Sequence, residues 1–272
     1  MKSIELLCFG NELLIGKVVN TNASFLAQEI TKAGAKVTRI VVMSDDLSDL
    51  AIGFQEALAR SPDYLITSGG LGPTFDDKTL EGLAKALELP LEENFDALEM
   101  VREAYAFLGE DLNPARKKMA ILPKNAIPIR NTAGTAPAVQ ITPKGTHTII
   151  YCLPGVPREL KAIFLEKILP EIAKTGSKYF QESFICSGVG ESSLAHLTEE
   201  IASQKPHIYL KSHPKMSEEK PVIEFHLTAT GDDPRLADEI KEVKQRLIMG
   251  LKSLGATIEN EEAHSASNHI NN

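Results

Sequence analysis

Three units in which a β-strand precedes an α-helix fill the first 87 residues, and this alternation constrains the fold more than any other feature. Apolar runs at 4–9, 37–43 and 64–66 predict buried strands. Each run is followed by a stretch whose apolar residues have helical spacing. Strands that alternate with helices form a mostly parallel sheet covered by helices on both faces. The sequence therefore predicts an α/β domain.

Polar residues and glycines follow each strand. Gly10, Asn11 and Glu12 come after the first strand, and Asp45 and Asp46 come after the second. The carboxyl ends of parallel strands meet at one edge of a sheet, which is where open α/β folds bind ligands. We therefore expect these residues to lie side by side at one rim. Two asparagines before the first helix are candidate ligand contacts or helix caps, Asn20 and Asn22.

The third strand runs into a glycine-rich loop, Thr67–Asp77, followed by a helical pattern. Its three glycines allow a tight turn and a close approach by a ligand. The start of the following helix presents N–H groups that suit a phosphate. The candidate ligand-binding residues of this loop are Ser68, Gly69, Gly70, Gly72, Pro73, Thr74 and Asp76.

The loop ends in two carboxylates, Asp76 and Asp77, where a phosphate would lie. Bare carboxylates repel a phosphate, so the combination makes sense if a metal ion bridges them. The acids could instead hold ribose hydroxyls or a water. A simpler alternative is that one of them caps the following helix, which is a common role for aspartate.

Two later loops can close over the same rim. One follows 127–131 and the other follows a predicted pair of strands at 138–142 and 148–153. Glu159 lies in the first turn of the helix after the second loop, where a helix dipole favours an acid. The candidate ligand contacts in these loops are Gly134, Thr135, Ala136, Pro137, Pro154 and Gly155.

A polar stretch of small residues at 174–178 predicts a domain boundary. We expect a first domain at 1–173 and a second at 178–256. The second domain has the pattern strand, helix, strand, strand, helix, which is typical of a small α+β fold. Residues 257–272 are mostly polar and predict a tail.

The formal net charge of −8 and the absence of a long basic run argue against nucleic-acid and anionic-membrane partners. No stretch of the sequence is apolar for long enough to span a bilayer. The three cysteines have no metal-site spacing and lie in apolar surroundings, which indicates buried thiols in a reducing cytoplasm. We therefore expect a cytoplasmic protein that acts on a small molecule.

The motifs together resemble the amino-terminal part of the CinA family (competence/damage-inducible protein A). That part belongs to the MoaB/Mog-like, molybdopterin-binding domain superfamily. The resemblance covers about residues 1–170 and implies a mostly parallel sheet sandwiched by helices, followed by a KH-like domain. One difference is Ala138, which stands where the family has glycine. The matching motifs are Gly10–Leu14, Gly16 with Asn20–Asn22, Ser44–Asp46, Thr67–Asp77, Gly134–Pro137 and Leu153–Glu159.

The resemblance also implies an activity. Related domains hydrolyse the pyrophosphate of ADP-ribose or FAD with a divalent metal such as Mg, Co or Mn. On this basis Asp77, Asp45 and Asp46 are the candidate catalytic residues, and Asp77, Asp45, Glu12 and Glu159 are the candidate metal ligands. A monovalent cation and a homo-oligomer are further expectations. We do not expect the nicotinamide mononucleotide deamidase activity of longer family members.

Two other functions stay open at this point. The domain could bind or adenylate a pterin as a molybdopterin-handling enzyme, because the same fold serves several functions. It could also be a noncatalytic nucleotide-binding module whose carboxylates only cap helices and stabilise loops. The sequence does not distinguish FAD from ADP-ribose or related pyrophosphates, because pocket shape selects the base and the sugar.

Overall fold

The computed structural model describes residues 1–174, 176–215 and 220–259. The chain divides into two compact units, Met1–Gly176 and Ser177–Asn272. Each unit has its own buried hydrophobic core. Within the described part of the chain, no helix is both long and apolar enough to cross a membrane.

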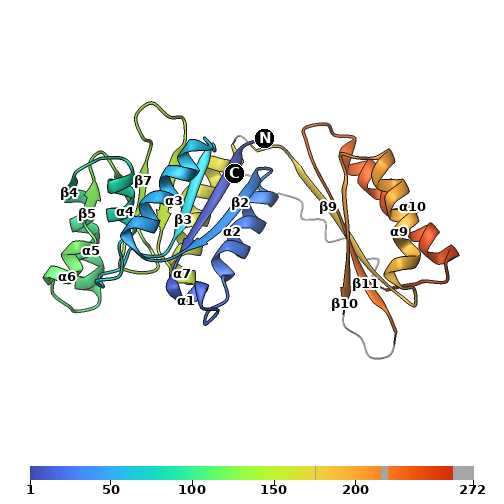
Figure 1. The fold of residues 1–272 in the computed structure, drawn as a ribbon, viewed down its shortest axis with the longest axis horizontal. Helices are drawn as coiled ribbons and strands as arrows, with labels where there is room; N and C mark the ends of the chain where they lie inside the picture. Colours follow the sequence, from blue (N-terminus) through green and yellow to red (C-terminus); the bar gives the residue numbers. More distant parts are fainter. Residues whose placement is uncertain (175, 216–219, 260–272) are drawn as a thin grey trace. The chain divides into compact units, whose positions relative to one another are not determined.

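A six-stranded sheet forms the centre of the first unit, in the order β2-β1-β3-β8-β7-β6 (Figure 1). The first four of these strands are parallel, β7 is antiparallel to β8, and β6 is antiparallel to β7. The mostly parallel sheet predicted from the sequence is confirmed. The strands are β1 (Ser3–Phe9), β2 (Lys36–Met43), β3 (Tyr64–Ser68), β6 (Ile127–Ile129), β7 (Ala138–Ile141) and β8 (Ile149–Leu153).

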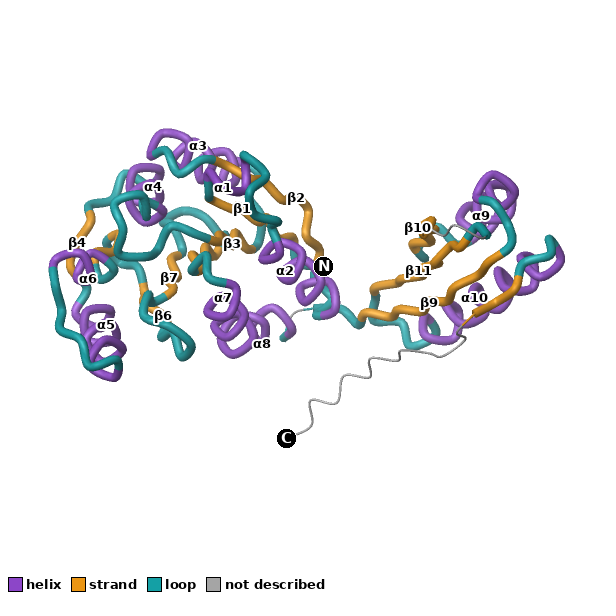
Figure 2. The backbone as a smooth tube through the Cα atoms, turned by 90° about the horizontal axis from the view of Figure 1, so that it is seen from below, coloured by secondary structure: helices purple, strands orange, loops and turns teal. Residues whose placement is uncertain are grey.

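Helices cover both faces of this sheet, as Figure 2 shows for α3 and α4 on one side and α2 and α7 on the other. Side chains alternate along a strand, so β1 supplies two cores. Its Leu7 packs in one core with Phe54 of α3, and its Leu6 packs in the other with Ile30 of α2. The helices are α1 (Asn11–Leu14), α2 (Thr21–Lys32), α3 (Leu47–Ala59), α4 (Thr79–Ala86), α5 (Phe95–Phe107), α6 (Pro114–Lys118), α7 (Pro157–Ile163), the π-helix η1 (Phe164–Ile168) and α8 (Leu169–Ala173).

Strands β4 (Leu91–Glu93) and β5 (Ile121–Pro123), one before and one after helix α5 in the chain, form a small antiparallel pair. The helix then starts because Asn94 caps it, its side-chain oxygen accepting the Ala97 N–H at 3.0 Å.

The second unit is a four-stranded antiparallel sheet in the order β10-β11-β9-β12, with two helices. The predicted small α+β domain is confirmed. Its element order, β-α-β-β-α-β, is the ferredoxin-like arrangement, which is more specific than the KH-like resemblance. The elements are β9 (Tyr179–Ser187), α9 (Glu191–Gln204), β10 (Tyr209–Lys215), β11 (Val222–Thr230), α10 (Leu236–Ser253) and β12 (Thr257–Glu259).

Strand β12 corrects the start of the predicted tail. It pairs with β9, and Ile258 packs against the core of the second unit. Glu259 accepts a hydrogen bond from the Ser187 hydroxyl at 2.7 Å. Three residues are too short to show a period in the sequence, so the strand could not be seen there. The rest of the predicted tail, 260–272, lies outside the described residues.

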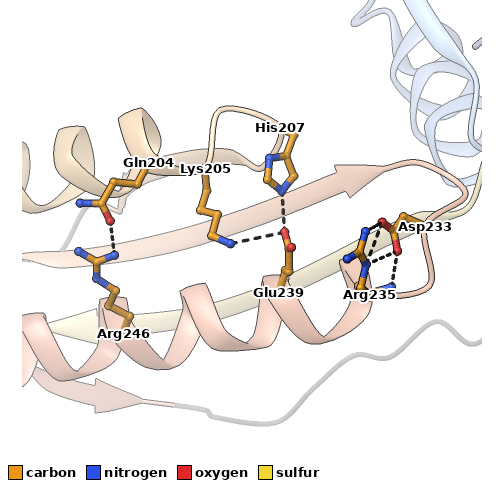
Figure 3. A network of polar contacts seen from close by, with 7 residues as sticks. All are labelled: Gln204, Lys205, His207, Asp233, Arg235, Glu239 and Arg246. Atoms are coloured by element: carbon orange, nitrogen blue, oxygen red, sulfur yellow. Dashed lines mark hydrogen bonds and ion pairs between the residues drawn. The ribbon is translucent and has the colours of Figure 1, made fainter.

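Polar contacts connect the end of α9 and the following loop to α10 (Figure 3). The Glu239 carboxylate contacts His207 Nε2 at 2.7 Å and Lys205 Nζ at 3.7 Å. Arg246 pairs with Glu200 at 2.6 Å. Exposed ion pairs of this kind each contribute little to the free energy of folding, so the buried core contributes most to holding these helices together.

Asp63 fastens the start of β1 to the loop before β3. Its carboxylate accepts hydrogen bonds from Lys2 Nζ at 2.7 Å and from the Ser3 N–H at 2.8 Å. Burial alone would raise the pKa of Asp63, but the bonds from Lys2 and Ser3 outweigh it and lower the pKa to about 2.

We expect Asp63→Asn to lower the free energy of unfolding by about 1 kcal/mol at pH 7, since Lys2 is partly solvent-screened. A depressed folded-state pKa stabilises above the unfolded value of about 3.9, and the benefit is lost as pH falls through about 2. Urea unfolding from pH 7 to pH 2 should show the difference closing below about pH 4. Asp232→Asn, at an exposed carboxylate, is the control. A difference in the free energy of unfolding between Asp63→Asn and the unsubstituted protein that does not depend on pH would contradict this account.

Candidate functional site

The ends of four neighbouring strands form the rim that the sequence predicts. The Gly10 N–H donates to the Met43 carbonyl at 3.1 Å, which joins the ends of β1 and β2. The Gly69 N–H donates to the Leu153 carbonyl at 3.0 Å, which joins the ends of β3 and β8. All the loops that follow these strands therefore begin at one edge of the sheet.

These loops enclose a pocket of about 460 Å³, which we call the rim pocket. It lies entirely within the first unit. The structure brings together here most of the candidate residues of the sequence. Those that line it are Gly10, Glu12, Asn20, Asn22, Asp45, Ser68, Gly69, Gly70, Gly72, Pro73, Asp76, Asp77, Thr135, Ala136, Pro154, Gly155 and Glu159.

Gly69 and Gly70 turn the chain at the base of the rim pocket. Both have positive φ, +108° and +69°, which favours glycine. A Cβ atom on Gly69 would lie 2.5 Å from the Phe9 carbonyl oxygen. The turn is held from the other side by Thr79, whose hydroxyl donates to the Gly69 carbonyl at 2.8 Å. The strand ends can pack this closely because position 69 has no side chain.

We expect Gly69→Ala to destabilise the protein by about 2–4 kcal/mol, because it combines a backbone clash with an unfavourable φ. Gly145→Ala is the matched control: Gly145 also has positive φ, at +82°, but a Cβ atom there would meet nothing within 4 Å. Its expected cost is about 1 kcal/mol. Thermal and urea unfolding of both variants measure the difference. Equal losses would show that the contact with Phe9 is unimportant.

The glycine loop lines the rim pocket, and the start of helix α4 does not. Helix α4 begins at Thr79, and its first N–H donates to the Gly70 carbonyl at 3.2 Å. Among the described residues, no protein acceptor takes the N–H groups of Gly70, Leu71 and Gly72. A further turn separates the glycine loop from the helix, and the predicted part of the helix start in phosphate binding stays a prediction.

Asp77 closes this turn and does not cap the helix. Its Oδ2 accepts the Thr74 N–H at 2.9 Å and the Thr74 hydroxyl at 2.7 Å, while the residue before α4 is Lys78. Lys118 of α6 donates to the carbonyl oxygens of Thr74 and Asp77 at 2.7 and 2.5 Å. Lys118 therefore holds the loop that carries the two aspartates.

Asn22 brings an unsatisfied oxygen to the rim pocket. Its side-chain N–H donates to the Gly155 carbonyl at 2.8 Å, which ties α2 to the loop after β8. The residue is 8% exposed, and its Oδ1 has no hydrogen-bond partner among the described residues. Asn20 has the simpler role that the sequence allowed, because it caps α2 by accepting the Ala23 N–H. This oxygen is itself buried, so a ligand N–H can reach it only if neighbouring groups move.

The rim pocket is strongly acidic. Five carboxylates are among its lining residues, all of them in the described part of the chain, and no lysine or arginine is. Burial raises the pKa of Asp45, the Asn11 N–H at 2.9 Å opposes this, and Glu12, Asp76 and Asp77 raise it further by repulsion. Such a site needs a counter-charge before it can hold a phosphate.

The carboxylates of the rim pocket could hold a divalent metal only together with other ligands. Within the described ranges, no group of three acidic, histidine or cysteine residues is arranged to hold a metal by itself. Magnesium, however, is commonly bound by one or two carboxylates together with water and the phosphates of a ligand. Of the candidate ligands, Asp45, Asp77 and Glu12 line the pocket and could hold a metal in that way.

Other candidates lie outside the rim pocket. Asp46 is exposed and stands at the N-cap of α3, although its side chain makes no cap hydrogen bond. Asn11, Thr74, Gly134 and Pro137 are also not among the lining residues. Asn11 contributes through its N–H to Asp45, and Thr74 contributes through Asp77. Gly134 and Pro137 line a second pocket instead.

Glu159 supports a loop as well as lining the pocket. Its Oε2 accepts a hydrogen bond from the Asn131 side chain at 2.6 Å. A Cβ atom on Gly134 would lie within 2.4 Å of this carboxylate, so the loop rests directly on it. This position gives Glu159 a clear structural role, and its predicted role as a metal ligand stays a prediction.

The apolar part of the lining was not predicted from the sequence. Val18 and Val19 stand in the loop before α2 and are 48% and 80% exposed. Two adjacent valines between a glycine and a helix cap were the signal that could have found them. The other residues missed are Phe9, Leu13, Thr21, Leu71, Val156 and Pro157. Apolar side chains beside a few polar groups are typical of pockets that bind small molecules.

Comparison with known proteins gives one family and several relatives. A family described as "Probable molybdopterin binding domain" matches residues 5–174. A Sulfurisphaera tokodaii protein is 40% identical over 258 residues, 93% of this chain and 95% of its own length. A Metallosphaera sedula protein is 42% identical over 260 residues, 94% of this chain and 96% of its own.

One solved structure is similar in both sequence and fold. It is the crystal structure of the protein CinA, of unknown function, from Thermoplasma acidophilum. The similarity has a TM-score of 0.58 and 41% identity, and it covers 63% of this chain and 99% of that one.

Proposed function

This chain belongs to the molybdopterin-binding domain family, and from that premise we propose that the rim pocket binds a phosphorylated ring compound of the molybdopterin class. The observation that carries the proposal is the set of unpaired N–H groups in the glycine loop that lines the pocket. The N–H groups of Gly70 to Gly72 have no protein acceptor among the described residues. Loop N–H groups suit a phosphate.

The shape and polarity of the pocket support the same ligand class. Val18, Val19 and Val156 give apolar surface on which a flat ring can lie. The five carboxylates require that the phosphate arrives with a divalent metal, which would supply the neutralising charge. Asp45 and Asp77 would bind that metal.

Binding of neopterin monophosphate tests this proposal, because the pterin ring is fluorescent. We expect saturable quenching in the presence of magnesium, and binding at least about tenfold weaker for neopterin without the phosphate. Val19→Ser removes exposed apolar surface and should weaken both compounds to a similar extent. Absence of binding with and without magnesium would contradict the proposal.

A second candidate is hydrolysis of a pyrophosphate such as that of ADP-ribose or FAD. It is favoured by the acidic cluster, because burial and three neighbouring carboxylates raise the pKa of Asp45. A bound metal lowers the pKa of its water and neutralises phosphate charge. In this reaction water attacks one phosphorus, the bridging P–O bond breaks, and two monophosphates leave. Asp45 or Asp77 would accept the proton of the attacking water.

Incubation of the protein with ADP-ribose, FAD or NADH, with magnesium, cobalt, manganese or EDTA, separates the candidates. Metal-dependent release of AMP that Asp77→Ala abolishes would support the hydrolase. Tight nucleotide binding without metal and without turnover that Val19→Ser weakens would instead support a noncatalytic module at the rim pocket. The monovalent cation, the homo-oligomer and the absence of nucleic-acid binding stay predictions.

A further inference from the structure

A second pocket of about 510 Å³ lies along α5, the loop after β6 and the start of α7. It shares Thr135 with the rim pocket, so the two pockets lie on either side of one short loop. Arg130 and Arg158 both line it, and we call it the arginine pocket. The function proposed above assigns no role to it.

The two pockets differ in charge. The rim pocket has five carboxylates and no cationic side chain in its lining, whereas the arginine pocket has two arginines and one acid, Glu103. Glu103 pairs with Arg130 at 2.5 Å. The described residues offer the Arg158 guanidinium no hydrogen-bond or ion-pair partner. An anion can therefore bind in the arginine pocket directly, without a metal to neutralise it.

Arg158 faces away from the acidic pocket for a simple geometric reason. It precedes Glu159 in the first turn of α7, and consecutive side chains on a helix point about 100° apart. Glu159 lines the rim pocket and Arg158 lines the arginine pocket. The start of α7 thus presents opposite charges to the two sides of the loop.

The lining of the arginine pocket also includes apolar side chains and one aromatic ring. Phe107 ends α5 with 91% of its surface exposed, and Leu108 beside it is 55% exposed. Exposed large apolar side chains that gather at a concave site mark a binding surface. A planar ring that stacks on the Phe107 side chain would cover it, as bases do on aromatic side chains of nucleotide-binding proteins.

The loop between the pockets is held in one conformation. The Asn131 side chain donates to the Ala136 carbonyl at 2.9 Å and to Glu159 at 2.6 Å, and its oxygen accepts the Ala133 N–H at 3.0 Å. Gly134 rests on the Glu159 carboxylate. A loop held by these hydrogen bonds is already ordered, so little conformational entropy is lost when a ligand binds.

We propose that the arginine pocket is a second subsite that binds a planar ring bearing a phosphate, such as a nucleoside monophosphate. Arg158 and Arg130 bind the phosphate, and Phe107 stacks on the ring. The proposal rests on the proposed function in so far as one extended ligand places one half in each pocket. Occupation of the arginine pocket by a monophosphate does not depend on the rim pocket and is tested alone.

Titration of the full chain with AMP in the presence of EDTA, followed by calorimetry, tests this subsite. Without a metal the acidic rim pocket repels AMP, so the binding that is measured belongs to the arginine pocket. We expect Arg158→Gln to raise the dissociation constant about tenfold or more and Phe107→Ser to raise it about fivefold or more. Adenosine and ribose 5-phosphate should each bind more weakly than AMP, because each lacks one of the two contacts.

Two matched variants serve as controls. Arg39→Gln removes an exposed arginine from β2, and Phe95→Ser removes a 73% exposed phenylalanine from the other end of α5. Neither residue lines the arginine pocket, so neither change should alter AMP binding. No binding of AMP in EDTA, or equal effects of Arg158→Gln and Arg39→Gln, would overturn the subsite. The rim-pocket proposal fails separately, by the loss of magnesium-dependent pterin binding.

Discussion

Lys244→Met is expected to lower the free energy of unfolding by about 3–5 kcal/mol, because it leaves a buried carboxylate without its partner. The Lys244 Nζ and Glu182 Oε2 atoms are 2.9 Å apart, and the two side chains are only 6% and 8% exposed. Lys244 comes from α10 and Glu182 from β9, so the pair joins the helix to the sheet of the second unit. Urea unfolding followed by circular dichroism measures the loss.

The double variant Lys244→Met with Glu182→Leu removes both charges and should recover most of this stability. Replacing a buried ion pair by apolar residues of similar size is often close to neutral, whereas removal of one partner is costly. Arg235→Met is the surface control: Arg235 pairs with Asp233 at 2.7 Å but is 82% exposed, and its loss should cost less than about 1 kcal/mol. If Lys244→Met costs no more than this control, the buried pair does not stabilise the unit.

The alternation of strands and helices in the first unit could be predicted because each element is long enough to show its period. The apolar run at 4–9 and the helical spacing of Leu26 and Ile30 depend only on which face is buried. The short strands β4 and β12 could not be predicted, since each has three residues. Their existence depends on pairing with distant strands, which a local pattern does not contain.

The location of the candidate site could be predicted for a similar reason. Parallel strands place their carboxyl ends at one edge, so Glu12, Asp45 and Asp77 had to lie near one another. The direction of each side chain could not be predicted. Asp45 and Asp46 are adjacent in the sequence, yet one lines the rim pocket and the other is exposed at the N-cap of α3. The difference is decided by where the strand ends and the helix begins.

The role of Asp77 also needed the structure. A carboxylate shortly before a helix is expected to cap it, but here the helix begins two residues later and Asp77 binds Thr74 instead. Lys118 then fixes the turn from α6, more than forty residues along the chain. Contacts between distant segments of this kind follow from the folded arrangement and have no signal in local sequence.

Asp45→Asn is expected to weaken magnesium-dependent binding of a phosphorylated ligand about tenfold to a hundredfold, by removing one negative charge from the metal's surroundings. Asparagine can still accept the Asn11 N–H that Asp45 Oδ2 accepts at 2.9 Å, so the loop keeps its shape. The matched control is Asp46→Asn, which removes the same charge one residue away, outside the rim pocket. Calorimetric titration with neopterin monophosphate and magnesium measures both variants.

The same substitution should act in the opposite direction on stability. Burial raises the pKa of Asp45, and repulsion by Glu12, Asp76 and Asp77 adds to the rise, so charging this residue disfavours the folded state. Because the pKa of Asp45 is higher in the folded state than in the unfolded state, its contribution to stability is fully present below its unfolded-state pKa. That contribution is lost as pH rises through its folded-state pKa. Asp45→Asn should therefore unfold at a higher temperature than the unsubstituted protein at pH 7, and at a similar temperature near pH 3. A lower melting temperature at pH 7 would show that Asp45 is a structural residue, whereas weaker binding with higher stability identifies a charge that is retained for the ligand.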